Sequence, residues 1–197
     1  MTTFFLNRLA TEPHALAFAG QSTPWPVALA DQTTDPSLDE ALRGHIAAAN
    51  RLLTPVAADL LTTTGRPVDL FGFAPNPARL GAAADATASV EGVALTQLGA
   101  LLDLEHLGYS VAAAKPVAVL GHSQGVLAVH MARAIEAAGS IEAAGATLDE
   151  ILAVAALIGA AGTRRVRELG LNPKYGEASP MLSVKGATRE QVEALVK

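Results

Sequence analysis

The sequence predicts an α/β fold in which a parallel sheet packs against helices, and three features of the chain favour this class. Two short apolar runs, residues 14–19 and 116–120, have the length and composition of buried strands. Segments with a helical spacing of apolar residues lie between and after these runs. The second run leads through a glycine-flanked turn into a helical segment, residues 126–138. Strands that alternate with helices in this way are typical of parallel sheets.

The composition indicates a globular domain and excludes several classes of partner and chemistry. Half of the 197 residues are hydrophobic and 17% are charged, which is ample for a packed core. A formal net charge of -5 gives no electrostatic reason to bind nucleic acid or an anionic membrane. The absence of cysteine excludes disulfides, thiolate catalysis and cysteine-ligated metal within this chain.

The hydropathy pattern predicts neither a membrane span nor a signal peptide. The longest uncharged apolar run, residues 151–162, has 12 residues and is too short to cross a bilayer. Residues 1–19 lack the basic-then-apolar order of a signal peptide. We therefore expect a cytoplasmic protein without a membrane partner.

The first half of the chain is predicted to be mostly helical. Residues 21–26 are expected to form a loop, because two prolines deny them regular structure. Residues 38–61 have helical spacing, and Pro55 is expected to kink or restart this helix. Glycine and proline in residues 65–80 predict a surface loop. Residues 90–107 are again predicted to be helical, with a glycine as the stop.

The middle of the chain predicts two helices joined by a short connection. Residues 126–138 form a helical pattern that ends at a glycine. The pentapeptide Ile-Glu-Ala-Ala-Gly occurs at residues 135–139 and again at residues 141–145. Two short copies are too few for a solenoid, so we expect the second copy to connect two helices. The next helix is predicted over residues 148–162.

The last part of the chain predicts a new strand and the start of a helix. Residues 180–184 have the composition of a strand. Thr188 and Gln191 then have the spacing of a capping box. Because this helix runs to Lys197, where the chain ends, we expect the chain to be a piece of a longer protein.

The clearest chemical signal is the motif Gly121-His122-Ser123-Gln124-Gly125 between a predicted strand and a predicted helix. A serine at a sharp strand-to-helix turn is the arrangement of a nucleophile elbow, in which the glycines leave room for close packing. The N–H of Gln124 can donate to the oxyanion of a tetrahedral intermediate. The alternative interpretation is a tight turn without chemistry.

A serine nucleophile needs a base, and none of the histidines is a convincing one. His122 is adjacent to the serine, and its side chain should leave the elbow on the other side. His130 lies seven residues after the serine, about two helical turns away. His14 precedes the first strand, and His45 and His106 lie on predicted helices. A surface or structural role is the preferred interpretation for each.

Several segments resemble a known family of acyltransferases. Phe18-Ala19-Gly20-Gln21 resembles the F-x-G-Q signature of acyl-CoA:ACP transacylase domains, and the elbow matches their GHSxG motif. Residues 89–98, 157–159 and 180–184 are similar to the acetyltransferase domain of microbial type I fatty acid synthases. The chain departs from many relatives at Ser22, where they carry a second glycine.

This resemblance implies a fold and a division of the chain. Residues 1–178 would form an α/β-hydrolase-like acyltransferase core, which would be incomplete in this chain. Residues 179–197 would begin a small ferredoxin-like subdomain.

The resemblance also implies ping-pong acetyl transfer that primes fatty acid synthesis. Acetyl-CoA would acylate Ser123, and the phosphopantetheine thiol of an acyl carrier protein would collect the acetyl group. The backbone amides of Gln21 and Gln124 would form the oxyanion hole, and His122 with the two elbow glycines would support the turn. The CoA thioester would be a substrate, with no permanently bound cofactor or metal. The other domains of a large homo-oligomeric synthase would be partners.

One position in the sequence favours acetyl as the transferred acyl group. Malonyl-specific relatives hold the free carboxylate with an arginine two residues after the glycine that corresponds to Gly159. This chain has Ala161 there, which favours acetyl over malonyl. Arg165 could take the role if the helix register differed by one turn, so malonyl stays open. Otherwise Arg164 and Arg165 are interpreted as surface arginines at a helix end.

The base and two competing functions remain open. In the family the general base is a histidine far beyond the serine, and no histidine follows His130, so we expect the base outside this chain. An α/β-hydrolase serine esterase with the same elbow would need an acid and a histidine after Ser123. A third possibility is an inert structural piece of a large assembly.

Overall fold

The computed structural model describes residues 8, 9, 11–20, 25–64, 86–168, 188, 190 and 191. The chain divides into two compact units, residues 1–164 and residues 165–197, and each is described by itself. Several sequence predictions lie outside the described residues, among them the role of Gln21, the loop at 65–80, the strand at 180–184 and the expected boundary between 178 and 179.

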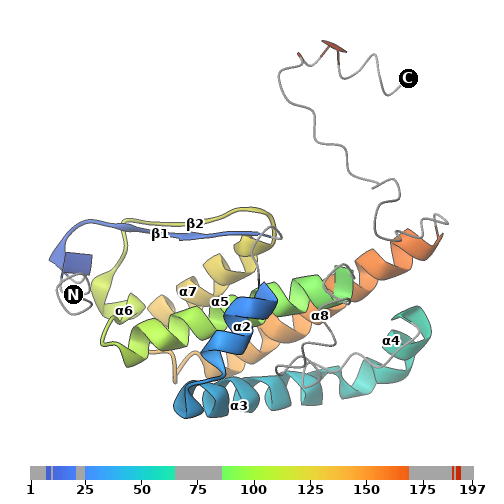
Figure 1. Cartoon of the computed structure of the whole chain (residues 1–197), viewed down its shortest axis with the longest axis horizontal. Helices are drawn as coiled ribbons and strands as arrows, with labels where there is room; N and C mark the ends of the chain where they lie inside the picture. Colours follow the sequence, from blue (N-terminus) through green and yellow to red (C-terminus); the bar gives the residue numbers. More distant parts are fainter. Residues whose placement is uncertain are drawn as a thin grey trace. The chain divides into compact units, whose positions relative to one another are not determined.

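In the described part of the first unit, two strands form a parallel sheet that lies along one side of a group of helices (Figure 1). Strand β1, Ala15–Phe18, pairs with strand β2, Ala118–Gly121, in a register that matches their first and last residues. A parallel pair requires a crossover, and here the connection contains helices α2 to α6. The predicted α/β class with a parallel sheet is confirmed.

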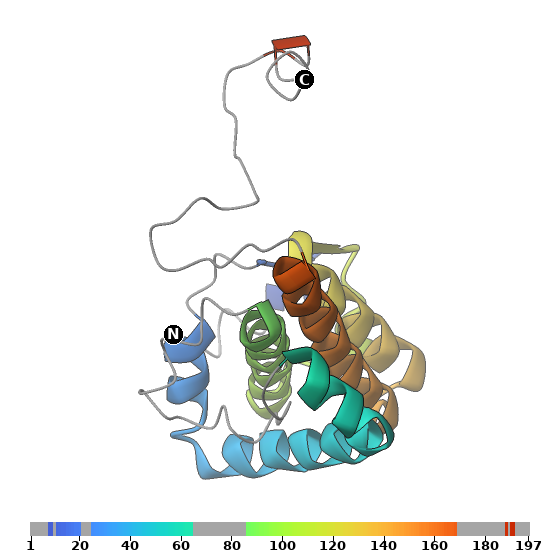
Figure 2. The same ribbon diagram turned by 90° about the vertical axis from the view of Figure 1, so that its right-hand side faces the viewer.

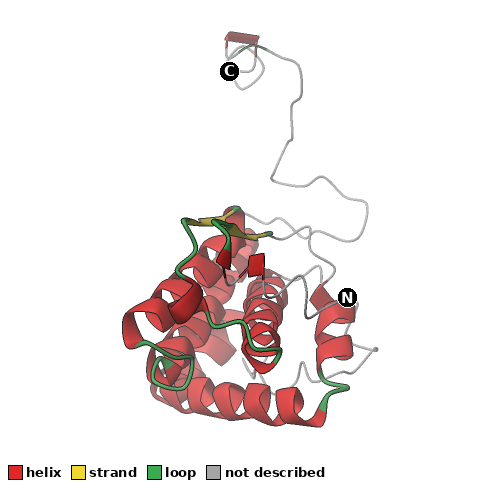
Figure 3. Cartoon of the chain, turned by 90° about the vertical axis from the view of Figure 1, so that its left-hand side faces the viewer, coloured by secondary structure: helices red, strands yellow, loops and turns green. Residues whose placement is uncertain are grey.

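Strand β2 is more exposed than the sequence predicted. Figure 3 shows the two strands at the rim of the helices, which lie on one side of them. Parallel sheets are usually buried on both faces, but Val117 is 71% exposed and Leu120 is 58% exposed. Both expected strands form, at residues 14–19 and 116–120, but the expectation that they are buried is wrong for each. The described helices cover only one face of the sheet.

Helix α2, Trp25–Gln32, corrects part of the loop predicted at residues 21–26. Pro26 is the second residue of this helix, where the missing N–H would have no partner in the helix anyway. Because a proline this close to the helix start is tolerated, α2 can begin within the segment that was expected to be a loop. Trp25 and Leu29 bury their side chains in the core.

The helix predicted at residues 38–61 is confirmed, together with its restart at Pro55. Helix α3, Pro36–Leu53, passes through the 3-10 turn η1, Thr54–Val56, into helix α4, Ala57–Thr64. The turn η1 contains the proline, as expected of a residue that cannot donate a backbone hydrogen bond.

Helix α5, Ala86–His106, is the central element of the first unit and confirms the helix predicted at residues 90–107. It packs against α2, α3 and α7, and Figure 2 shows it running through the middle of the helices. Several of its residues are fully buried: Val93, Ala94, Leu95 and Leu98. Gly108 follows with a φ of +92°, a conformation that glycine adopts without strain. The short helix α6, Val111–Ala114, leads to β2.

Helix α7, Val126–Ala138, agrees with its predicted bounds, and Gly139 ends it with a φ of +84°. The second copy of the pentapeptide forms the turn at residues 141–144, so its predicted role as a connection is confirmed. Helix α8, Gly145–Glu168, is longer at both ends than the prediction of 148–162.

Helix α8 is long and apolar enough to cross a membrane by length and composition alone. The segment Gly145–Arg165 has 21 residues, and its most apolar window has a mean hydropathy of 1.5. It is longer than the 12-residue uncharged run at residues 151–162, from which the sequence predicted no membrane span. Core helices of globular domains satisfy the same criterion. One face of α8 packs into the core of the first unit, where Leu148, Leu152, Ala155 and Ala156 are fully buried.

In the second unit, the described residues confirm the predicted capping box. The backbone N–H of Thr188 donates to Oε1 of Gln191 over 2.8 Å. The backbone N–H of Gln191 donates in return to the Thr188 hydroxyl over 3.3 Å. This reciprocal pair satisfies two donors at a helix start.

Candidate active site

Ser123 lies at the turn between β2 and α7, as predicted for an elbow. The strand ends at Gly121, and a 3-10 turn, η4, Ser123–Gly125, leads into α7. Ser123 has a φ of +54°, in the left-handed region that a residue with a side chain rarely adopts. Its side chain is exposed, so the strained turn presents the hydroxyl to solvent.

Backbone hydrogen bonds hold this turn in place. The N–H of His122 donates to the carbonyl of Phe18 over 3.0 Å, and the N–H of Gly125 donates to the carbonyl of His122 over 2.9 Å. The first bond ties the elbow to the end of β1. His122 thus supports the elbow through its backbone.

The elbow glycines are sites of close packing. A Cβ on Gly121 would lie 2.5 Å from the carbonyl oxygen of Gly125. A Cβ on Gly125 would collide with the carbonyl oxygen of Phe18. Both contacts are too short for real Cβ atoms, so a side chain at either position would force the strand and helix apart. This agrees with the sequence interpretation of the two glycines.

Gly20 brings the first motif against the second. A Cβ on Gly20 would lie 2.6 Å from the carbonyl oxygen of His122 and 2.8 Å from Cβ of Ser123. The two motifs are far apart in the sequence, yet Gly20, two residues after the end of β1, lies against the serine. Gln21, the predicted oxyanion residue of this motif, lies outside the described residues. The structure therefore places the backbone that precedes Gln21 directly beside Ser123.

Gln124 occupies the position expected for an oxyanion donor. It follows Ser123 in the turn that opens α7, where backbone N–H groups lack partners further up the helix. The elbow also stands at the carboxyl end of β2, the edge at which parallel α/β sheets bind their ligands. Oε1 of Gln124 is buried and has no hydrogen-bond donor among the described residues.

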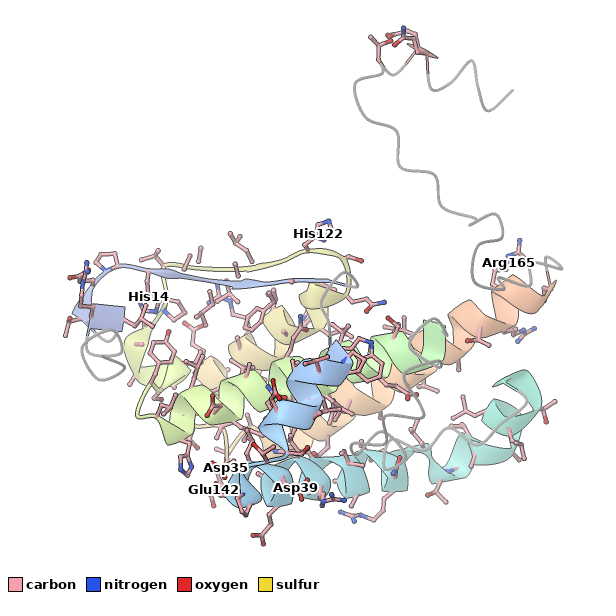
Figure 4. The ribbon with its side chains drawn as sticks, in the orientation of Figure 1. His14, Asp35, Asp39, His122, Glu142 and Arg165 are labelled. Carbon is pink, nitrogen blue, oxygen red and sulfur yellow. The ribbon has the colours of Figure 1, made fainter. Side chains whose placement is uncertain are left out.

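The histidines are not placed to activate Ser123. Figure 4 shows the exposed His122 side chain pointing away from the helices. His14 precedes β1, at the opposite end of the sheet, and its Nε2 lies 2.6 Å from the Tyr109 hydroxyl. Nδ1 of His45 lies 2.6 Å from Oδ1 of Asp149. Within the described part of the chain, no histidine side chain forms a hydrogen bond with Ser123.

The residues weighed for acyl-group selection lie on α8. Ala161 is exposed. Arg165 is largely exposed and pairs with Glu168 over 3.3 Å, which agrees with its interpretation as a surface arginine (Figure 4). Among the described residues, no group of three or more histidine, aspartate or glutamate side chains could hold a metal ion.

The structure brings to the site Gln97, which falls within the resembling segment 89–98 but has no role predicted from the sequence. Its Nε2 donates to the carbonyl of Ala19, next to Gly20. The side chain is only 7% exposed, on a helix whose other inward positions are mostly apolar. A glutamine in the buried stripe of a helix was the available signal.

Comparison with known proteins identifies a family for this chain. A family model described as "Starter unit:ACP transacylase in aflatoxin biosynthesis" matches residues 81–197, which is more than half of the chain and includes the elbow. No curated protein and no solved structure matches the chain.

Proposed function

The chain belongs to the starter unit:ACP transacylase family, and on this premise we propose that Ser123 carries the acyl group during transfer from coenzyme A to an acyl carrier protein. Membership of the family supports an acyltransferase that uses a CoA thioester and an acyl carrier protein. The identity of the acyl group, the residues that carry the reaction and the surrounding multienzyme belong to the proposal.

The main support for the proposal is the strained backbone of Ser123, which is packed closely against glycines. Ser123 holds a φ of +54° at the strand-to-helix turn, while Gly20, from a distant part of the chain, packs against its Cβ. Strain of this kind persists only where the surrounding structure enforces it, and it is concentrated at functional sites. The same turn points the hydroxyl outward and begins a helix behind it.

The proposed reaction has two half-reactions. Oγ of Ser123 attacks the thioester carbon and gives its proton to a general base, and the carbon–sulfur bond then breaks to release coenzyme A as a thiol. The carrier thiol attacks the resulting serine ester, the carbon–oxygen bond breaks, and Oγ regains a proton. The N–H of Gln124 and, in our proposal, that of Gln21 stabilise the oxyanion in both steps.

We also propose acetyl as the acyl group and a type I fatty acid synthase in the cytoplasm as the setting. Ala161 supports this choice, because it cannot clamp a free carboxylate as an arginine would. The sequence resemblance supports the fatty acid synthase setting, and the family match supports acyl transfer to an acyl carrier protein.

The test is transfer of a labelled acyl group to the full-length protein. After incubation with labelled acetyl-CoA and rapid acid quenching, we expect the label on the peptide that contains Ser123. Addition of an acyl carrier protein should then remove the label from the enzyme and place it on the carrier. Ser123→Ala should take no label, while His130→Ala, on the exposed face of α7, should be labelled as the wild type is.

Other outcomes would contradict separate parts of the proposal. Label on another residue, or none, would reject Ser123 as the acyl carrier. Faster labelling by malonyl-CoA would overturn the interpretation of Ala161. Hydrolysis of simple esters without transfer to a carrier would favour a serine esterase.

A further inference from the structure

Gln97 lies on helix α5 and contacts the backbone of Ala19, next to Gly20. Helix α5 packs against η4, and the side chain of Gln97 is more than nine-tenths buried. Its Nε2 donates to the carbonyl of Ala19. We propose that Gln97 is a positioning residue that holds the Ala19–Gly20 backbone at its working distance from Ser123. This inference rests on the proposed function.

The backbone at Ala19 is held from two sides. On one side, the amide of Gln97 binds the Ala19 carbonyl. On the other side, the elbow packs closely against this backbone. A Cβ on Gly125 would lie 2.9 Å from the Ala19 carbonyl oxygen, and a Cβ on Gly20 would lie 2.8 Å from Cβ of Ser123. The peptide bond that follows Gly20 contains the N–H of Gln21, which is proposed to bind the oxyanion. A shift of the backbone at Ala19 would therefore change the position of this proposed donor.

Gln97 uses only the donor end of its amide. Its Oε1 is buried and has no hydrogen-bond donor among the described residues. Glutamate has nearly the same shape but, when ionised, offers acceptors only. The substitution Gln97→Glu therefore replaces the donor that faces Ala19 with an oxygen. Protonation of that carboxyl restores an O–H donor.

The experiment measures single-turnover acylation of Ser123 by acetyl-CoA in the full-length protein, from about pH 5.5 to about pH 8. At the alkaline end, we expect Gln97→Glu to acylate about 10- to 100-fold more slowly than the wild type, because a displaced oxyanion donor stabilises the transition state less. The ratio of variant to wild-type rate should rise as the pH falls. The KM for acetyl-CoA should change little, because the thioester is bound before the oxyanion forms.

Gln32→Glu is the matched control. Nε2 of Gln32 donates to the carbonyl of Thr96 over 3.0 Å, on the same helix α5. Its Oε1 is also buried without a donor among the described residues. The Gln32 contact joins α2 to α5, whereas the Gln97 contact joins α5 to the backbone beside the elbow. The ratio of the Gln32→Glu rate to the wild-type rate should therefore stay close to one at every pH.

The outcomes separate this inference from the proposed function. Suppose that Ser123 of the wild type is acylated. An unchanged acylation rate in Gln97→Glu, or equal losses of rate in both glutamate variants, would then overturn the positioning role and leave the proposed function intact. If the wild type accepts no acyl group from CoA, the proposed function fails. Labelling of Ser123 by a fluorophosphonate then decides the positioning role, because phosphonylation needs the same nucleophile and oxyanion donors. Equal labelling rates, or no labelling of the wild type, would reject it.

Discussion

Ser123 occupies a backbone conformation that glycine would adopt without strain. The left-handed region costs a residue with a side chain about 1–2 kcal/mol. The hydrogen bonds from His122 to Phe18 and from Gly125 to His122 hold the turn in that conformation. A glycine would remove the strain, so the stability of the turn does not explain the serine, which is consistent with its proposed role as the nucleophile.

At the same scale, Gly20→Ala tests the contact between the two motifs. The added Cβ would lie 2.6 Å from the His122 carbonyl oxygen, so the end of β1 must move away from the elbow. We expect acylation of Ser123 to fall by about 100-fold or more, because small misplacements of reacting groups have effects of this size. Labelling by acetyl-CoA measures the rate.

Gly145→Ala is the control for this substitution. Nothing lies within 4 Å of a Cβ at Gly145, so acylation should be unchanged. A Gly20→Ala protein that acylates at the wild-type rate would show that the contact has no role in the reaction.

At the scale of elements, the start of α3 shows how one side chain sets a helix boundary. Asp35 is the N-cap, and its Oδ1 accepts from the backbone N–H groups of Ser37 over 2.9 Å and Leu38 over 3.3 Å. Together with the hydroxyl of Ser37, which is the largest cause, these bonds lower the pKa of Asp35. The start of α3, the end of α5 and Ile141 line a pocket of about 240 Å³. Figure 4 shows Asp35, which lines this pocket, on the other side of the helices from His122 of the elbow.

The lowered pKa of Asp35 predicts a pH-dependent contribution to stability. A carboxyl whose pKa is lowered by folding stabilises the protein fully above its unfolded pKa, about 3.9, and loses this contribution as the pH falls through the folded pKa. We therefore expect Asp35→Ala to lower the melting temperature by a few degrees at neutral pH. The difference from the wild type should shrink in acid.

Asp35→Ser separates capping from charge, because serine is also a good N-cap but does not ionise. Thermal melts followed by circular dichroism should show near wild-type stability at neutral pH and less loss on acidification. A constant difference between wild type and Asp35→Ala down to the lowest pH would contradict the assignment to this carboxyl.

At the scale of the whole molecule, the first unit is organised around α5. This helix packs against α2, α3 and α7, and through Gln97 it reaches the backbone beside the elbow. Trp25, the one tryptophan in the chain, is 5% exposed and packs its ring against Gly92. The position of α2 against α5 therefore depends on the absence of a side chain at Gly92.

Gly92→Ala should disturb this packing. Alanine favours a helix over glycine by about 1 kcal/mol, but a Cβ at Gly92 would collide with the Trp25 ring. We expect a net destabilisation of about 1–3 kcal/mol, in the range for an overpacked core. Urea unfolding followed by tryptophan fluorescence measures it. Gly44→Ala, where nothing lies within 4 Å of the Cβ, should instead stabilise the protein; equal effects of both substitutions would reject this account.

Local signals in the sequence predicted the elements whose boundaries depend on a few neighbouring residues. Pro55 and Gly139 end or restart helices because of their own backbone chemistry, and Thr188 caps a helix with Gln191, three residues away. The prediction was wrong where the outcome depends on more distant contacts. Residues 116–120 were expected to be buried, yet Leu120 is 58% exposed, because the described helices cover only one face of the sheet.

By itself, the sequence determined that Ser123 stands in a strand–turn–helix motif, because the glycines, the apolar strand and the helical spacing are local properties of the chain. Only the tertiary structure decided that Gly20 packs against Ser123 and that Gln97 binds the backbone beside it. It also decided that Leu120 is exposed. These features join residues far apart in the chain or depend on which face of the sheet is covered, and no local pattern specifies either.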